Sequence, residues 1–337
     1  MIREAIAKLI AGKDLPRDEA YRTMLEIMNG ETTESQIAGY LVGLRVKGET
    51  VDEIVGSALA MREKAEKLHI DEDVILDTCG TGGDNAGTFN ISTAAALVAA
   101  AAGAVVAKHG NRAISSKSGS ADVLKALGMN LDNLDLQKAE HALREIGIAF
   151  LFAPLHHKSM RFAAPVRRDL GVRTVFNLLG PLTNPAGANR QLMGVYSRDI
   201  VPTVAEVLRD LGSQAAMVVH GEPTMDEISL CGKTYVAELK LGKIETYEIT
   251  PEEFGFSRVN LSDLVVQNQE ESVNAFITAI RGSKSPFLDA VLLNAGAAIY
   301  LAGIAENLKA GIHKARVTIE EGRAERKLKS LIEITAI

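Results

Sequence analysis

One stretch of this 337-residue chain constrains its fold more than any other: DTCGTGGDNAGTFNIST, from Asp77 to Thr93. Apolar residues of strand type, 74–76, precede it, and an Ala-rich segment of high helix propensity, 91–102, follows it and ends at Gly103. Between the two, most side chains are small or polar. The stretch therefore predicts a strand that leads through a glycine-rich loop into the beginning of a helix.

This loop has the properties of a phosphate-binding site. Its glycines permit positive φ and leave backbone N–H groups open to an anion, and the polar residues at the helix start add hydroxyls and the positive end of the helix dipole. The residues are Gly80, Gly82, Gly83, Asn90, Ser92 and Thr93. The stretch has neither G-x-G-x-x-G nor the Walker pattern, and a bare glycine turn between strand and helix is often only structural. A phosphate loop of another kind is the functional alternative.

A second polar stretch, KHGNRAISSKSGSAD from Lys108 to Asp122, follows a strand expected at residues 105–107. Its start would lie at the sheet edge where open α/β sheets bind ligands. Lys108 is a compact cation for a phosphate, and Asn111 offers both a donor and an acceptor. The serines that follow are Ser115, Ser116, Ser118 and Ser120. Alone, this stretch reads as a polar loop with a helix cap, but two such loops indicate a ligand with two phosphorylated ends.

Paired carboxylates, Asp226 and Glu227, follow a strand expected at residues 216–219. An acidic turn of this kind is often without function. Beside a diphosphate, however, one or two carboxylates together with phosphate oxygens are the ligands that Mg²⁺ takes. Asp84 and Ser92 offer further oxygens. The sequence therefore indicates a magnesium site next to the glycine-rich loop.

Histidines, arginines and a proline-containing segment lie between the second polar stretch and the acidic pair. Adjacent His156 and His157 point apart on a helix and have no third ligand nearby, which argues against a metal site. The arginines face solvent in the simplest interpretation, although one of them is a candidate to hold a carboxylate by a bidentate contact. These are Arg161, Arg167, Arg168 and Arg173. The segment NLLGPLTNP, residues 177–185, predicts a rigid loop suited to a pocket wall.

The chain changes architecture near residue 70. Residues 1–70 predict four short helices, with capping-box patterns at Thr33 and Thr50, and from residue 74 strand and helix alternate. The fold class is therefore α/β: a small N-terminal helical bundle, residues 1–70, and a larger α/β domain, residues 71–337, with a mostly parallel central sheet flanked by helices. Helices near residues 157–185 are candidates to pack with the bundle.

The expected strands of the larger domain also include residues 148–152 and 192–196 and a hairpin at 235–249. The expected helices cover residues 121–127, 136–146, 200–211, 273–280, 288–301 and 304–329. In the bundle, apolar residues lie on more than one face of a helix, which favours packing on another subunit as well as on the same chain. They are Ile37, Tyr40, Leu41 and Leu44.

Composition excludes several classes of function. The net charge of −6 argues against broad binding to nucleic acid or anionic membranes, and 4% aromatic residues without Trp argue against stacking on bases. Cys79 and Cys231 form neither a metal cluster nor a disulfide framework, as is typical of a cytoplasmic chain. The longest apolar run, residues 94–107, is too short to span a bilayer.

Taken together, the motifs resemble the anthranilate phosphoribosyltransferases of tryptophan biosynthesis. GTGGD at 80–84, NIST at 90–93, the stretch at 108–122, NLLGPLTNP at 177–185 and DE at 226–227 stand in that family's order and spacing. The resemblance covers essentially the whole chain. It implies the fold class shared with pyrimidine nucleoside phosphorylases and a homodimer formed through the N-terminal helices.

The resemblance also implies an activity, a cofactor and a set of binding residues. The enzyme would transfer the phosphoribosyl group from phosphoribosyl pyrophosphate to the amine of anthranilate, with Mg²⁺ as cofactor and Lys108 supporting the leaving group. Phosphoribosyl pyrophosphate would be held by Gly80, Gly83, Asp84, Thr88, Asn90, Ser92, Thr93, Lys108, Ser116 and Ser120. Mg²⁺ would be held by Ser92, Asp226 and Glu227, and anthranilate by Gly80, Asn111 and Arg167. Arg167 is taken over Arg168 from its place in PVRRDLG.

The chemistry of this transfer agrees with the residues present. Displacing pyrophosphate builds negative charge on the leaving group, so stabilising that group lowers the barrier most. An aromatic amine is already neutral at neutral pH and needs no strong base, so His109 is expected only to shape the pocket. Two alternatives are a pyrimidine nucleoside phosphorylase of the same fold and a non-enzymatic nucleic-acid-binding relative. The Asn111 loop beside two phosphate sites argues against the first, and the acidic charge argues against the second.

Overall fold

The computed structural model describes residues 1–112, 118–131 and 134–336. The predicted ligand Ser116 and its neighbour Ser115 lie outside these ranges. No helix in the described part of the chain is long and apolar enough to cross a membrane.

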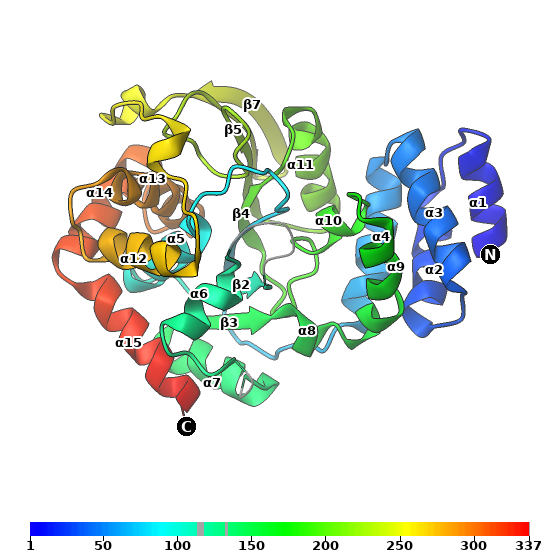
Figure 1. Ribbon diagram of the computed structural model, residues 1–337, viewed down its shortest axis with the longest axis horizontal. Helices are drawn as coiled ribbons and strands as arrows, with labels where there is room; N and C mark the ends of the chain where they lie inside the picture. Colours follow the sequence, from blue (N-terminus) through cyan, green and yellow to red (C-terminus); the bar gives the residue numbers. More distant parts are fainter. Residues whose placement is uncertain (113–117, 132–133, 337) are drawn as a thin grey trace.

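The N-terminal helices form a bundle at one end of the molecule (Figure 1). They are α1 (Ile2–Ile10), α2 (Arg17–Asn29), α3 (Glu34–Lys47) and α4 (Val51–Lys64). Thr33 and Thr50 each cap a helix through the expected capping box, which fixes where α3 and α4 begin. The four apolar residues of α3 are buried within this chain, Tyr40 and Leu44 at 0% exposure, because α3 packs on α1 and α9. The additional packing of the bundle on another subunit stays a prediction.

A seven-stranded sheet in the order β3-β2-β1-β4-β5-β6-β7 forms the centre of the larger part. The first five strands are parallel, and β6 and β7 form the antiparallel hairpin at one edge. The strands are β1 (Leu76–Gly80), β2 (Val106–Gly110), β3 (Ile148–Phe152), β4 (Arg190–Gly194), β5 (Ala215–Gly221), β6 (Thr234–Lys240) and β7 (Lys243–Ile249). The predicted α/β class with a mostly parallel sheet is confirmed.

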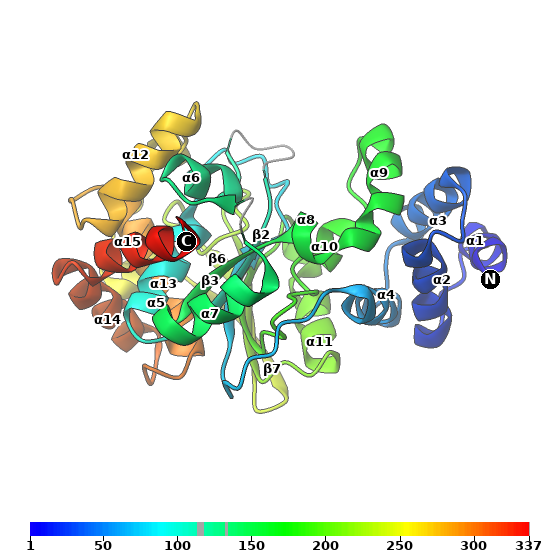
Figure 2. The same ribbon diagram turned by 90° about the horizontal axis from the view of Figure 1, so that it is seen from below.

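Helices cover both faces of this sheet (Figure 2). On one face the apolar side chains of α5 and α13 pack against each other and against alternate residues of the strands, such as Leu192 and Met217. The next residues along, Met193 and Val218, face the opposite side, toward α11 and α4. The remaining helices are α5 (Ile91–Ala101), α6 (Ser120–Ala126), α7 (Leu136–Ile146), α8 (Ala153–His156), α9 (Ala164–Leu170), α10 (Phe176–Leu179), α11 (Val201–Asp210), α12 (Gln269–Ile280), α13 (Pro286–Leu301), α14 (Leu308–Glu320) and α15 (Arg323–Ala336).

Two of the predicted strands ended several residues before the observed ones. The expected strands at 74–76 and 105–107 are β1 and β2, which continue to Gly80 and Gly110, so Lys108 and His109 lie within a strand and not after it. The polar residues stay extended because β1 pairs with β4 along its whole length, and β2 pairs likewise with β3. The single helix expected at 304–329 was also wrong: α14 and α15 are separated at Gly322, whose φ of 69° breaks the helix.

Short helices connect the sheet to the bundle. After β3, the turn at Lys158–Phe162 packs on α2, α9 packs on α3, and α10 packs on α4. One continuous apolar cluster joins α2, α3 and α4 to these helices and to the inner residues of β4 and β5. The division of the chain into two domains near residue 70 stays a prediction.

Candidate active site

The glycine-rich loop runs from the end of β1 to the start of α5. Gly82 and Gly83 adopt φ of 64° and 73°, a backbone conformation that side chains strongly disfavour. Just after them the Asp84 carboxylate accepts a hydrogen bond from the N–H of Ala86 at 3.1 Å, which closes a tight turn. The loop thus exposes backbone at the carboxyl end of the sheet, as the sequence predicts for an anion site.

The acid turn, residues 226–227, lies directly on the ends of the neighbouring strands. Gly80 of β1 pairs with Gly194 of β4. A Cβ atom on Gly80 would overlap the Asp226 carboxylate, and one on Gly194 would overlap the Asp226 carbonyl. Two adjacent strands therefore end in glycine because Asp226 occupies the space that side chains would need.

Hydrogen bonds join the acid turn to the glycine-rich loop. The N–H of Gly82 donates to Asp226 Oδ2 at 2.8 Å, and the N–H of Ser92 donates to Glu227 Oε1 at 3.1 Å. In return, the N–H of Asp226 donates to Asp84 Oδ2 at 3.3 Å. Residues more than 130 positions apart in the sequence thus form one site.

Carboxylates outnumber cations among the described residues of this site. Burial and then the nearby Asp84 raise the pKa of Asp226 to about 7, and burial and then Asp226 raise the pKa of Glu227 well above its usual value. Lys108, buried at 4% exposure, opposes the second shift; its Nζ donates to the carbonyl of Thr78 and, at 3.4 Å, to the Ser92 hydroxyl. An oxygen-rich site with crowded carboxylates suits a divalent cation.

A complete cation cage made by the protein alone is absent from the described residues, since no group of three His, Cys, Asp or Glu side chains has the arrangement to hold a metal. This agrees with the chemistry of Mg²⁺, which uses one or two carboxylates and completes its shell with water and phosphate oxygens. The donor set at Ser92, Asp226 and Glu227 therefore fits a magnesium ion that arrives with a phosphorylated substrate.

Asn90 connects the two polar loops. Its Nδ2 donates to the carbonyl of Ser118 at 3.3 Å, and its Oδ1 accepts from the hydroxyl of Ser272 in α12 at 3.0 Å. In the second loop the Ser120 hydroxyl donates to the carbonyl of Asn111 at 3.2 Å. Thr88 belongs to the first loop and forms an antiparallel bridge with Val265.

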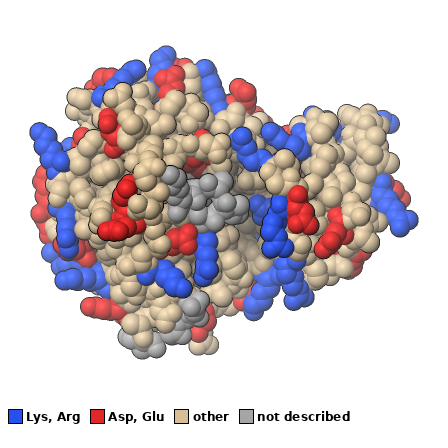
Figure 3. All heavy atoms as spheres, in the orientation of Figure 1, with Lys and Arg blue, Asp and Glu red and all other residues tan. Residues whose placement is uncertain are grey.

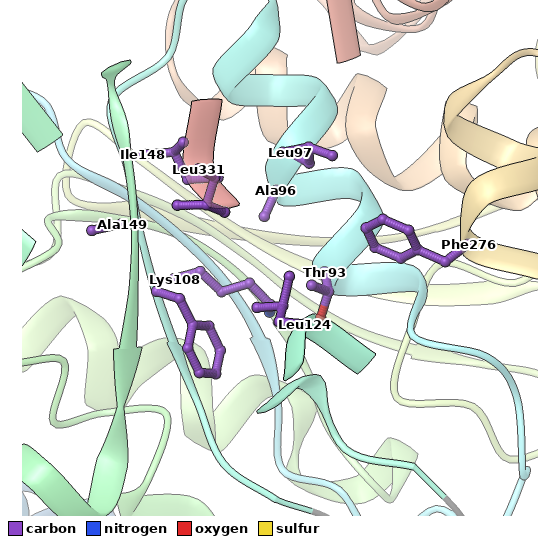
Figure 4. A pocket seen from close by; sticks show the side chains of 10 residues that line it. Thr93, Ala96, Leu97, Lys108, Leu124, Ile148, Ala149, Phe276 and Leu331 are labelled. Atoms are coloured by element: carbon purple, nitrogen blue, oxygen red, sulfur yellow. The ribbon is translucent and has the colours of Figure 1, made fainter. Parts of the chain in front are cut away.

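Thr93 differs from the other predicted ligands of phosphoribosyl pyrophosphate. Its hydroxyl is buried and has no hydrogen-bond partner among the described residues. It lines a small apolar cavity together with Leu124, Phe276 and the stem of Lys108 (Figure 4). In this arrangement the hydroxyl faces the core. The prediction that Thr93 binds the substrate therefore depends on its backbone N–H in the first turn of α5.

The predicted anthranilate residues lie on separate elements. Asn111 is exposed just beyond β2, and its Oδ1 accepts from the N–H of Arg112 at 2.7 Å. Arg167 lies in α9, with its guanidinium 5.2 Å from the centroid of the Phe176 ring, and burial lowers its pKa. Arg168 beside it is exposed. Figure 3 shows a hollow between the α/β part and the bundle, with Lys and Arg side chains along it.

Comparison with known proteins shows the family and the fold of this chain. The sequence matches the glycosyl transferase family, with its helical bundle domain at residues 3–65 and its a/b domain at 72–325. The anthranilate phosphoribosyltransferase of Laribacter hongkongensis is 52% identical over 334 residues, covering 99% of this chain and 97% of that protein. The crystal structure of the enzyme from Thermus thermophilus superposes with a TM-score of 0.94 at 46% identity, covering 99% of both chains.

The chain belongs to the anthranilate phosphoribosyltransferase family. A more distant member, the enzyme from Saccharomyces cerevisiae in complex with phosphoribosyl pyrophosphate and Mg, has 28% identity and a TM-score of 0.90 and covers 99% of this chain and 98% of that one. The fold of the anthranilate phosphoribosyltransferases is therefore kept across bacteria and yeast, with the same bundle and sheet.

In this member of the anthranilate phosphoribosyltransferase family, the His109 ring is buried against the ring of His157. Its Nδ1 lies 3.2 Å from the carbonyl of Gly180, and its ring centroid lies 5.1 Å from that of His157. Burial lowers the pKa of His109 well below its usual value and that of His157 to about 4. Two imidazoles whose pKa values are lowered by burial suit a pocket wall and not a strong general base.

Sequence reasoning missed several residues that hold the site together. Gly194 supports the acid turn, Ser272 orients Asn90, and Asn184 donates both to Asp77 Oδ2 and to the carbonyl of Ala107, each at 2.8 Å. Only Asn184 stood in a motif with a sequence signal. The roles of the others depend on contacts between distant segments, which no local pattern reveals.

Proposed function

We propose that this protein transfers the phosphoribosyl group from phosphoribosyl pyrophosphate to the amine of anthranilate. The products are N-(5-phosphoribosyl)anthranilate and pyrophosphate, in the pathway of tryptophan biosynthesis. The observation that supports this most strongly is the junction of the acid turn with the glycine-rich loop, through Gly82 with Asp226 and Ser92 with Glu227. Relatives over the whole length with this activity in their names add support.

The substrate's pyrophosphate end is assigned to the glycine-rich loop and the start of α5. Backbone N–H groups there would meet the phosphate oxygens, and Lys108 lies close enough to Ser92 to add a positive charge. We assign to this substrate Gly80, Gly83, Asp84, Thr88, Asn90, Ser92, Thr93, Lys108, Ser116 and Ser120, of which Ser116 lies outside the described residues. Mg²⁺ held by Ser92, Asp226 and Glu227 would neutralise charge on the leaving pyrophosphate.

Catalysis in this proposal comes from position and charge. As the bond to pyrophosphate lengthens, negative charge grows on the leaving oxygen, and Lys108 with the loop N–H groups stabilises that charge more in the transition state than in the ground state. The amine of anthranilate attacks as a neutral nucleophile and, after the new bond forms, loses a proton to water. His109, buried against His157 and the carbonyl of Gly180, shapes the wall of the pocket.

Anthranilate is assigned to Gly80, Asn111 and Arg167. Arg167 is favoured over Arg168 because it is partly buried and its pKa is lowered by burial, with no carboxylate acting on it in the described part of the chain. A substrate carboxylate would supply the missing negative charge in a bidentate contact. Arg168 is exposed, so water already stabilises its charge and it has less need of a substrate carboxylate.

We also propose a homodimer formed through the bundle, in the cytoplasm. Two apolar side chains of the bundle are left exposed by the chain itself. Ile10 of α1 is 78% exposed, and Val46 of α3 is 82% exposed. A second copy covering this surface would remove them from water. The two free thiols suit a reducing compartment.

Mixing the protein with anthranilate, phosphoribosyl pyrophosphate and Mg²⁺ tests the proposed activity. Anthranilate fluorescence should fall, and it should not fall when either the second substrate or the metal is omitted. Folded protein that leaves the fluorescence unchanged would refute the activity. Phosphate-dependent release of a base from a pyrimidine nucleoside, or tight salt-sensitive DNA binding without turnover, would support instead the alternatives drawn from the sequence, neither of which the relatives support.

A further inference from the structure

Asn294 is a buried amide in the middle of an apolar helix. It lies in α13, between Leu293 and Ala295, and has 0% exposure. Its Oδ1 accepts from the N–H of Ile228 at 3.0 Å, and its Nδ2 donates to the carbonyl of Ile228 at 3.0 Å and to that of Ala290 at 3.0 Å. The side chain thus pairs with both polar backbone groups of one residue, as a neighbouring strand would.

Such an amide is costly to bury unless every hydrogen bond is made. A leucine would fill the same space in α13 without that cost. The presence of asparagine therefore points to a requirement at Ile228, whose backbone has no strand partner in the segment between β5 and β6.

Ile228 directly follows the acid turn. Before the turn, Met225 and Gly221 exchange backbone hydrogen bonds at 2.7 and 2.8 Å, and after it the N–H of Ser229 donates to the Thr234 hydroxyl at 2.9 Å. Both of these contacts lie within the segment 221–234 itself. Asn294 adds an anchor from α13, a separate element.

The anchor also closes a circuit of contacts. α13 packs along α5, the helix that carries Ser92, and the N–H of Ser92 donates to Glu227 at 3.1 Å. The acid turn is thus held against one pair of helices at two points, through Glu227 to α5 and through Ile228 to α13. Displacement of Ile228 would change the direction of both carboxylates.

We propose that Asn294 is a positioning residue that holds Asp226 and Glu227 in the geometry required to bind Mg²⁺. This inference rests on the proposed Mg²⁺-dependent transfer and assigns to that site a residue that touches neither metal nor substrate. Residues behind metal ligands set the orientation of those ligands, and their loss typically weakens metal affinity by about 10- to 100-fold.

The test compares Asn294→Leu with the wild-type protein in two measurements. The first is the dissociation constant of Mn²⁺, used as a probe for Mg²⁺, measured with pyrophosphate present and followed by electron paramagnetic resonance, which needs no turnover. The second is the Mg²⁺ concentration that gives half-maximal turnover. Both are expected to rise by about 10-fold or more in the variant, while the KM for anthranilate stays within about twofold because Asn111 and Arg167 lie on other elements.

Two further variants separate positioning from general stability. Leu292→Ala removes a buried side chain of α13 that points about 200° away from Asn294 around the helix. It should lower the melting temperature without weakening Mn²⁺ binding. Asn294→Asp keeps the acceptor for the Ile228 N–H and loses the donor, so its Mn²⁺ affinity should fall between wild type and Asn294→Leu; it also serves if the leucine variant does not fold.

Folded Asn294 variants whose Mn²⁺ affinity and Mg²⁺ dependence match those of Leu292→Ala would overturn the inference. Failure of the proposed function has a different signature, since the wild-type protein itself would then show no turnover. The Mn²⁺ measurement would still decide the role of Asn294 in that case.

Discussion

The N–H of Ser92, in the first turn of α5, donates to the Glu227 carboxylate at 3.1 Å across 135 residues of sequence. This contact joins the element that offers N–H groups to an anion with the element that offers oxygens to a cation. A diphosphate with its magnesium ion needs both elements in a fixed arrangement, since a misplacement of about 1 Å can cost about 10²-fold in rate. The site therefore depends on the relative position of two segments more than on either alone.

Removing the charges of the acid turn should strongly weaken Mg²⁺-dependent turnover and leave the fold intact. In the double variant Asp226→Asn, Glu227→Gln, we expect kcat/KM to fall by about 10²-fold or more. Stability should hold or increase, because burial and mutual repulsion raise the pKa of both carboxyls. Steady-state kinetics over a range of Mg²⁺ concentrations, with thermal unfolding as control, measures this. Unchanged metal dependence would remove both residues from the site.

Lys108→Met should lower kcat by about 10²- to 10³-fold, because the buried ammonium near Ser92 would no longer stabilise the leaving group. The KM for anthranilate should change little. Lys125→Met, on the last turn of α6, is the matched control and should keep full activity. Equal activity of the two variants would contradict the role given to Lys108.

The backbone at Gly194 leaves no room for a side chain. Gly194→Ala would force its Cβ into the Asp226 carbonyl and displace the acid turn, so we expect activity to fall by about 10²-fold. Gly39→Ala in α3 would place its Cβ 3.5 Å from Ile6, an ordinary contact, and should leave activity unchanged. Assays of both variants at saturating Mg²⁺ distinguish a local clash from a general intolerance of alanine.

Arg167 and Arg168 can be separated by substrate dependence. Arg167→Ala should raise the KM for anthranilate by about tenfold or more, as loss of a charge-assisted contact predicts, without changing the KM for phosphoribosyl pyrophosphate. Arg168→Ala should behave as wild type because that side chain is exposed. The reverse result would transfer the anthranilate contact to Arg168.

Stability should fall on acidification because of a buried histidine. Burial lowers the pKa of His157 from 6.5 to about 4, so the unfolded chain binds a proton that the folded chain does not. Its share of stability is fully present above pH 6.5 and is lost as the pH falls toward 4, at most about 3 kcal/mol.

Chemical denaturation at several pH values, for wild type and His157→Gln, measures this share. The variant should lose less stability between the two pKa values. Exposed His141→Gln is the control and should follow wild type. Identical pH dependence of wild type and His157→Gln would contradict the assignment.

Local sequence patterns predicted the bundle, the parallel sheet and most helices because caps, glycines and apolar periodicity act over a few residues. The predicted ends of β1 and β2 came too early. In β2, Lys108 and His109 are polar, and only pairing with β3 keeps them extended. The motifs around Gly82, Ser92 and Asp226 were visible in the sequence. Gly194, Ser272 and Asn294 were not, because their roles arise where distant segments meet. The break at Gly322 did have a local signal, a glycine within a charged helix.

A crystal structure of the protein with phosphoribosyl pyrophosphate and Mn²⁺, read from the anomalous signal of the metal, tests the central claim most directly. We predict a metal peak about 2.2 Å from a carboxylate oxygen of the acid turn, with the pyrophosphate group against the N–H groups of the glycine-rich loop. A fully bound substrate whose metal lies away from Asp226 and Glu227 would contradict the account.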